Sequence, residues 1–95
     1  MMNATTGSKN APVLVQQGMI TVIFETGQKS ARPSMLTLKN EFQEIIHTSF
    51  HAHMAGEVGL EIILVRGDVA RFRALEQQLM GRRGIRSARL TLIPS

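Results

Sequence analysis

The sequence predicts an α+β domain in which two helices alternate with four strands. Three observations support this class. Apolar, β-branched segments occupy 18–25, 59–66 and 85–93, apolar residues recur at helical spacing over about 32–46, and Asp68 stands where a second helix would need its N-cap. The element order is β-α-β-β-α-β. That order is typical of a ferredoxin-like fold, a four-stranded antiparallel sheet with two helices on one face.

The first strand is expected between Gly18 and Gly27, because glycines bound its apolar, β-branched run. Residues 1–17 before it are rich in Asn, Thr, Ser, Gly and Gln and are predicted to form a flexible N-terminal arm. Within this arm, 13–15 could add an edge strand. The folded domain is therefore expected at 18–95.

The first helix is predicted at about 32–46. Met35, Leu38, Phe42 and Ile45 follow one another at intervals of three, four and three residues, which places them on one helix face. Pro33 is compatible with this helix because it falls in the first turn.

Two strands follow, at 48–54 and 59–66, and the loop between them contains Gly56. This loop is so short that the strands must be antiparallel neighbours. Both faces of the strand at 59–66 are largely apolar, so one face can pack on the helices while the other requires a partner. We therefore expect oligomerisation through the sheet.

The second helix is expected to begin after Asp68, with a buried stripe that includes Phe72, Leu75 and Leu79. Either Gly81 or Gly84 would end it by adopting a positive φ. The last strand, 85–93, is predicted to point Ala88, Leu90 and Leu92 inward, and Pro94 ends it.

Composition limits the classes of protein that fit. The 95 residues suit one domain, and no apolar run approaches the roughly 18 to 20 residues of a membrane span. Without a secretory signal, a cytoplasmic location is the default expectation. The chain has no cysteine, which excludes disulfides and thiolate metal sites.

The chain carries a net charge of +4, and its basic residues concentrate near the C-terminus. Seven of the eleven lie in the last third of the chain: Arg66, Arg71, Arg73, Arg82, Arg83, Arg86 and Arg89. Arg82, Arg83 and Arg86 are candidates for an anion or nucleic-acid patch. The alternative is a solvated helix face with its neighbouring turn.

An H-x-H pair, His51 and His53, is the sequence feature that most suggests specific chemistry. Alternate side chains of a strand share a face, so the two imidazoles should stand together on what we expect to be a central strand of the sheet. The pair is a candidate metal site. Packing of two half-exposed histidines at a subunit interface and proton sensing are the alternatives.

Catalysis has little support in the sequence, so no enzyme is predicted. The seven carboxylates are scattered and no nucleophile stands in a readable motif. RNA-binding domains share this element order, but the third strand lacks the aromatic residues that stack on bases.

Four segments together resemble the C-terminal regulatory domain of the nickel-responsive transcriptional repressors, the NikR family, over about 18–93. They are Gly18-Met-Ile-Thr-Val, His51-x-His53 with Gly59-Leu-Glu-Ile after five intervening residues, Val65-Arg-Gly-Asp-Val, and Arg83-Gly-Ile-Arg. The resemblance implies an ACT-like regulatory domain, at 18–95, that forms a tetrameric core. A ribbon-helix-helix that reads DNA has no counterpart in the 17 residues before the first strand.

The resemblance also implies a nickel site built from an H-x-H pair, a cysteine on the next strand and a histidine from a neighbouring subunit. His51 and His53 match the pair, whereas Gly59 stands at the cysteine position and Asn40 at that of the neighbouring subunit's histidine. Without a thiolate, a nitrogen and oxygen site suits Zn, Co, Ni or Cu alike. His47, Glu61 and Asn40 are further candidate ligands.

The sequence thus predicts a metal-sensing or regulatory domain that binds a divalent transition metal through His51 and His53. It would act as a homo-oligomer, a dimer or tetramer, or through a protein partner such as a full-length regulator, with no membrane contact and no direct sequence-specific DNA binding. The alternative is a metal-free ACT-like module that binds a small molecule or serves structural oligomerisation.

Overall fold

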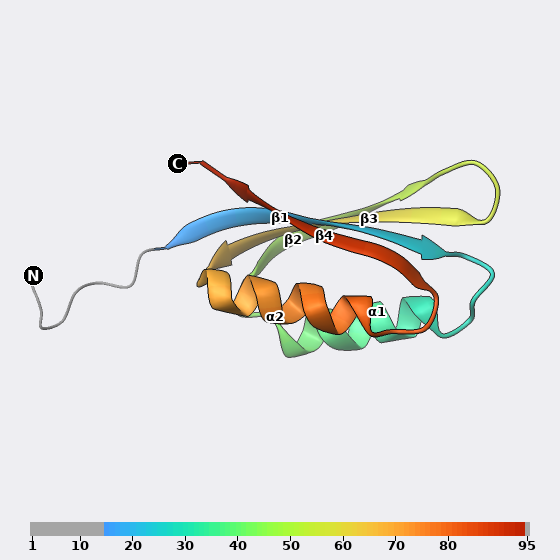
Figure 1. Ribbon diagram of the computed structural model, residues 1–95, viewed down its shortest axis with the longest axis horizontal. Coiled ribbons are helices and arrows are strands. Elements are labelled where there is room, and N and C mark those ends of the chain that lie inside the picture. The colour runs from blue at the N-terminus through green and yellow to red at the C-terminus, as the bar shows by residue number, and fades with distance from the viewer. Residues whose placement is uncertain (1–14, 95) are drawn as a thin grey trace, which may run out of the picture.

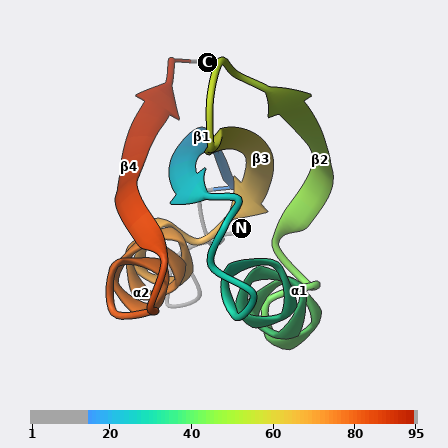
Figure 2. The same cartoon turned by 90° about the vertical axis from the view of Figure 1, so that its right-hand side faces the viewer.

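The computed structural model, which describes residues 15–94, has four strands in one antiparallel sheet, with two helices on one of its faces (Figures 1 and 2). The strand order across the sheet is β2-β3-β1-β4. In chain order the elements are β1 (Gln16–Glu25), α1 (Ala31–Glu41), β2 (Ile46–His53), β3 (Val58–Gly67), α2 (Val69–Met80) and β4 (Ile85–Ile93). This confirms the predicted β-α-β-β-α-β fold. Neither described helix is long and apolar enough to cross a membrane.

The two central strands are β1 and β3, which pair from Gln16 opposite Gly67 to Glu25 opposite Val58. The strand that carries the H-x-H pair, β2, therefore lies at an edge of the sheet, and its expected central place was wrong. A short hairpin requires β2 to lie beside β3, but it leaves open which of the two pairs with β1. Here β1 pairs with β3, because β3 offers apolar residues to both faces of the sheet.

The first helix ends at Glu41, five residues before the predicted end, and turns lead from there into β2. Phe42 and Ile45 nevertheless remain buried, as their helical spacing suggested. The backbone N–H of Arg66 donates to the carbonyl of Ile45 at 2.7 Å, so the chain is already held against β3 before β2 begins. The predicted arm, 1–17, lies mostly outside the described residues, and its last two residues belong to β1.

The second helix begins as predicted, since Asp68 Oδ1 accepts a hydrogen bond from the backbone N–H of Ala70 at 2.9 Å. It ends at Met80, and the cap residue Gly81 has an ordinary φ of −84°. The positive φ falls later, at Gly84 with +89°, where the chain turns into β4. A Cβ on Gly84 would also lie 2.8 Å from that of Gln28, so both conformation and space favour glycine there.

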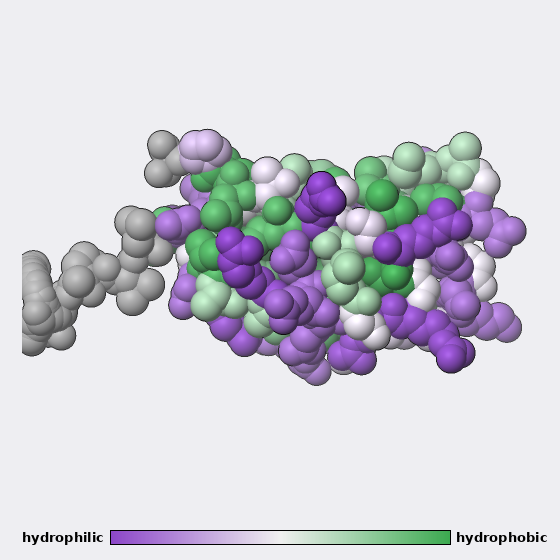
Figure 3. Space-filling view, viewed as in Figure 1, coloured by the Kyte–Doolittle hydropathy of each residue, from purple (hydrophilic) through white to green (hydrophobic). Residues whose placement is uncertain are grey.

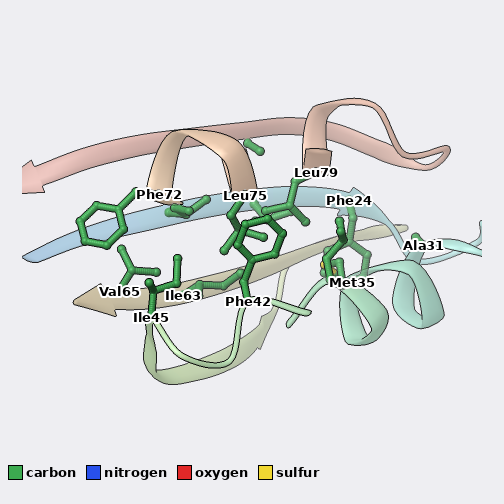
Figure 4. Packing of buried hydrophobic residues seen from close by; sticks show 14 residues of the cluster. Phe24, Ala31, Met35, Phe42, Ile45, Ile63, Val65, Phe72, Leu75 and Leu79 are labelled. Atoms are coloured by element: carbon green, nitrogen blue, oxygen red, sulfur yellow. The ribbon is translucent and has the colours of Figure 1, made fainter. Parts of the chain in front are cut away.

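The core lies between the sheet and both helices (Figure 4). Its fourteen buried residues are Ile20, Val22, Phe24, Ala31, Met35, Leu38, Phe42, Ile45, Ile63, Val65, Phe72, Leu75, Leu79 and Ala88. On β4, Ala88 is buried and Leu90 packs against the core, but Leu92, predicted to point inward, is 40% exposed. Its neighbour across the ladder is Gly18, which has no side chain to cover it.

The opposite, outer face of the sheet is also largely apolar. The strand registers place Met19 and Ile23 of β1 on this face beside Leu64 and Leu60 of β3, with Ile62 between them. Phe50 of β2, opposite Ile62, extends the apolar surface and is 53% exposed. No element within residues 15–94 covers this face, since both helices lie on the other side (Figure 2).

Candidate functional site

The H-x-H pair lies on the helix-covered side of the sheet. His51 is opposite Glu61 on β3 and His53 is opposite Gly59, and both of these β3 residues are buried toward the helices. The two imidazole ring centroids are 6.2 Å apart. The prediction that both side chains share one face therefore agrees with the register, although both residues are exposed at the sheet edge.

Both ring nitrogens of His51 already have neighbours. Nε2 lies 2.8 Å from Nη2 of Arg32, in the first turn of α1, and Nδ1 lies 3.4 Å from Oε1 of Glu61. A guanidinium can only donate, so Nε2 is the acceptor in this hydrogen bond. The ring also stacks obliquely on Phe24, with centroids 5.6 Å apart. The Nε2 lone pair that a metal ion would need is thus occupied by Arg32.

Glu61 is the one charged residue buried among residues 15–94, at 5% exposure. Its Oε2 accepts from Nζ of Lys39 at 2.5 Å, and the same ammonium donates to Oγ of Ser49 at 3.2 Å. A carboxylate is rarely buried without such a partner, because its desolvation is costly. Lys39 therefore joins α1 to both β2 and β3.

Gly59, at the position of the family's cysteine, lies beneath the ring of Phe24. A Cβ built on Gly59 would overlap three atoms of this ring, including Cε1 at 2.8 Å. Phe24 is fully buried. The space that a thiol side chain would need is consequently filled by an aromatic ring.

Two further candidate ligands are not brought to the pair. His47 is the extra residue of a bulge between Ile46 and Thr48, which breaks the alternation that would have placed it on the same face. It lines a small pocket of about 140 Å³ with Gln17 and Arg66, farther along the strand. Asn40 is exposed near the end of α1.

The three candidate anion-patch arginines lie around the turn between α2 and β4. Arg86 donates from Nε to Glu25 at 3.0 Å, so its charge is partly neutralised. Arg83 is exposed and Arg82 is partly buried. Their positions around one turn agree with the alternative to an anion patch, a solvent-exposed helix face with its neighbouring turn.

Arg32 and Lys39 were missed by the sequence reasoning. They are seven residues apart, two turns of helix, and so point to the same side of α1. The seven-residue spacing can be read from the sequence. The sequence does not show that this side of α1 faces β2.

These residues do not fit the four-ligand nickel site that the resemblance implies. Within residues 15–94, no group of three or more His, Cys, Asp or Glu side chains could hold a metal ion. The cysteine position is a glycine under an aromatic ring, and Arg32 occupies Nε2 of His51. Transition-metal sites of this class need about four ligands.

Solved structures with the same fold include an uncharacterized protein from Thermotoga maritima, with a TM-score of 0.76 and 17% identity, covering 85% of this chain and 100% of that one. The ACT domain from the GTP pyrophosphokinase of Chlorobium tepidum has a TM-score of 0.67 and 12% identity, covering 82% and 100%. At such identities these likenesses show the fold alone, which is ACT-like.

Sequence relatives identify the family. A protein named "Putative nickel-responsive regulator 2" from Methanothermobacter thermautotrophicus is 32% identical over 74 residues, 78% of this chain and 53% of that protein. A "Putative nickel-responsive regulator" from Methanopyrus kandleri is 31% identical over 78 residues, 82% and 54%. This chain spans about half the length of these curated relatives. The family model described as "NikR C terminal nickel binding domain" matches residues 17–93. The chain belongs to this family of NikR C-terminal domains.

Proposed function

We propose that this chain is an oligomeric regulatory domain whose copies associate through the outer face of the sheet. The regulatory role is inferred from relatives that are named nickel-responsive regulators. The observation that supports oligomerisation is the apolar outer face of the sheet.

The outer face has the composition of an interface. Three consecutive outward residues of β3, Leu60, Ile62 and Leu64, form its centre and are only partly buried. Phe50 adds an exposed aromatic ring at the β2 edge. Contiguous exposed apolar surface of this kind marks protein contacts, and each Å² removed from water contributes about 25 cal/mol.

A second copy of the same chain is the expected occupant. Hydrophobic residues gather mostly over the strands, in the upper part of Figure 3, whereas hydrophilic residues dominate over the helices below them. One face of the domain is thus suited to contact and the other to water. Two copies related by a twofold axis would cover both apolar faces at once. A protein partner, or a mixed assembly with a full-length regulator, would use the same face.

The sequence alone predicts metal binding through His51 and His53, but the proposed function does not depend on it. Its support is the shared face of the two imidazoles and the family's name. Co, Zn and Cu, like Ni, would need ligands beyond this pair.

Sedimentation equilibrium tests the oligomer. The wild-type mass should be a multiple of the 10.5 kDa chain, whereas Ile62→Lys, which places a charge at the centre of the outer face, should be a folded monomer. Gln77→Lys on the exposed side of α2 is the matched control and should assemble as the wild type does. A monomeric wild type at high micromolar concentration would reject the proposal.

A further inference from the structure

We propose that Arg32 and Lys39 are built-in cations that take the place of a bound metal ion, so that α1, β2 and β3 are joined without metal. The inference concerns the helix-covered side of the sheet. It goes beyond the proposed oligomerisation, which uses the outer face.

The two cations connect α1 to the edge strand β2 and to its neighbour β3. Arg32 joins the start of α1 to His51 on β2. Lys39, two helical turns later, joins the same helix to Ser49 on β2 and to Glu61 on β3. Three elements are therefore linked through three side-chain hydrogen bonds, and Glu61 also faces His51 at 3.4 Å.

The local charge disfavours a divalent cation. Arg32 and Lys39 contribute two positive charges, and Glu61, the acidic partner of this cluster, contributes one negative charge. A metal ion at His51 would have to displace the guanidinium from Nε2 and then remain near two fixed cations. At separations of a few ångström, repulsion between like charges opposes binding of a divalent ion in the absence of compensating ligands.

The packing of Phe24 also prevents a further metal ligand on β3 from reaching the histidine pair. Because its ring lies against both Gly59 and His51, no donor from the start of β3 can reach the pair without moving a fully buried side chain. His53 is left as a single exposed imidazole beside the cluster. Arg32, Lys39, His51 and Glu61 each have a polar partner within the cluster as it stands, so the domain should not respond to nickel.

Nickel titration of the chelator-stripped protein tests this inference, with calorimetry and melting temperature as readouts. The wild type should show no specific heat of binding and no change in Tm. A domain of this size that bound nickel would gain about 10 °C or more at a hundredfold excess over its Kd. Arg32→Ala frees Nε2 of His51 and removes one positive charge, so weak nickel binding should become measurable, with an affinity at least about tenfold above any residual wild-type value.

Arg83→Ala is the matched control, since it removes an exposed arginine from the turn after α2 and should leave nickel affinity at the wild-type level. The gain in Arg32→Ala should disappear in Arg32→Ala/His51→Ala. Wild-type nickel binding that is lost in His51→Ala would overturn the inference, and so would an Arg32→Ala protein no better than the control. Sedimentation of the same samples reports the oligomer separately, so failure of one proposal leaves the other testable.

Discussion

Different forces stabilise the two halves of the helix-covered face of the sheet. Under α2, Phe72, Leu75 and Leu79 are fully buried against the sheet and form an apolar half. Between α1 and β2 lies a polar corner, formed by Arg32, Lys39, His51 and Glu61. The residues of β2 are mostly exposed, so apolar packing cannot fix this edge strand against the helix. The comparison teaches that apolar burial fixes α2 on the sheet, whereas charge pairing and hydrogen bonds fix β2 against α1.

The largest expected effect is in the apolar half. Phe72→Ala removes a fully buried ring and should lower the free energy of unfolding by about 3–5 kcal/mol, through lost burial and the cavity that remains. Urea denaturation followed by circular dichroism measures it, with Arg73→Ala on the exposed side of α2 as the control. A loss below about 1 kcal/mol would contradict the description of the α2 half as the part that apolar burial stabilises.

The polar corner should respond differently, because its stability depends on charge pairing. Lys39→Met keeps most of the length of the side chain but leaves the buried Glu61 carboxylate without its ammonium partner, and should cost about 2 kcal/mol. Lys39 is about one quarter exposed, so solvent limits the loss. Lys29→Met, at an exposed lysine before α1, is the control.

A double-mutant cycle separates pairing from packing in this corner. Adding Glu61→Gln to Lys39→Met removes the unpaired charge, so the double variant should be more stable than Lys39→Met alone. Strictly additive losses in the same denaturation experiment would mean that the Lys39–Glu61 contact contributes no coupling, and the corner would then be maintained by packing after all.

Most of the fold could be predicted from the sequence because its signals are local. Strand alternation, the spacing of Met35 and Leu38, and the Asp68 cap depend on residues near one another in the chain. The position of β2 at the sheet edge is instead a long-range feature, set by the pairing of β1 with β3, and the expectation of a central β2 did not take it into account. The bulge at His47 was equally invisible, although it decides which face the residue joins.

The candidate site was predicted only in part. The shared face of His51 and His53 follows from strand geometry alone. Their neighbours do not, since Arg32 and Phe24 reach His51 from elements distant in sequence. Glu61 was considered as a ligand, whereas in the structure it is the buried partner of Lys39. What a site can bind depended on these long-range contacts more than on the motif.

The smallest expected effect concerns the ion pair that links the turn after α1 to α2, between the two halves. Arg71 donates from Nε to Glu44 at 2.8 Å and lies over the ring of Phe42, 4.3 Å from its centroid. The hydrogen bond from Arg71, more than any other cause, lowers the pKa of Glu44 below its ordinary value. A carboxyl whose pKa is lowered by folding stabilises the protein above its unfolded pKa, of about 4.3, and loses this contribution as the pH falls through the lower folded value.

Glu44→Gln should therefore melt slightly below the wild type at neutral pH, and the difference in Tm should vanish in acid below the lowered pKa. Both side chains are about half exposed, which keeps the effect small and sensitive to salt. Thermal melts of both proteins between neutral pH and acid measure it, with Glu41→Gln, an exposed carboxyl at the end of α1, as the control. A difference that grew as the pH fell would have the wrong sign for this ion pair, and the link between the halves would then have to come from Arg71 on Phe42 alone.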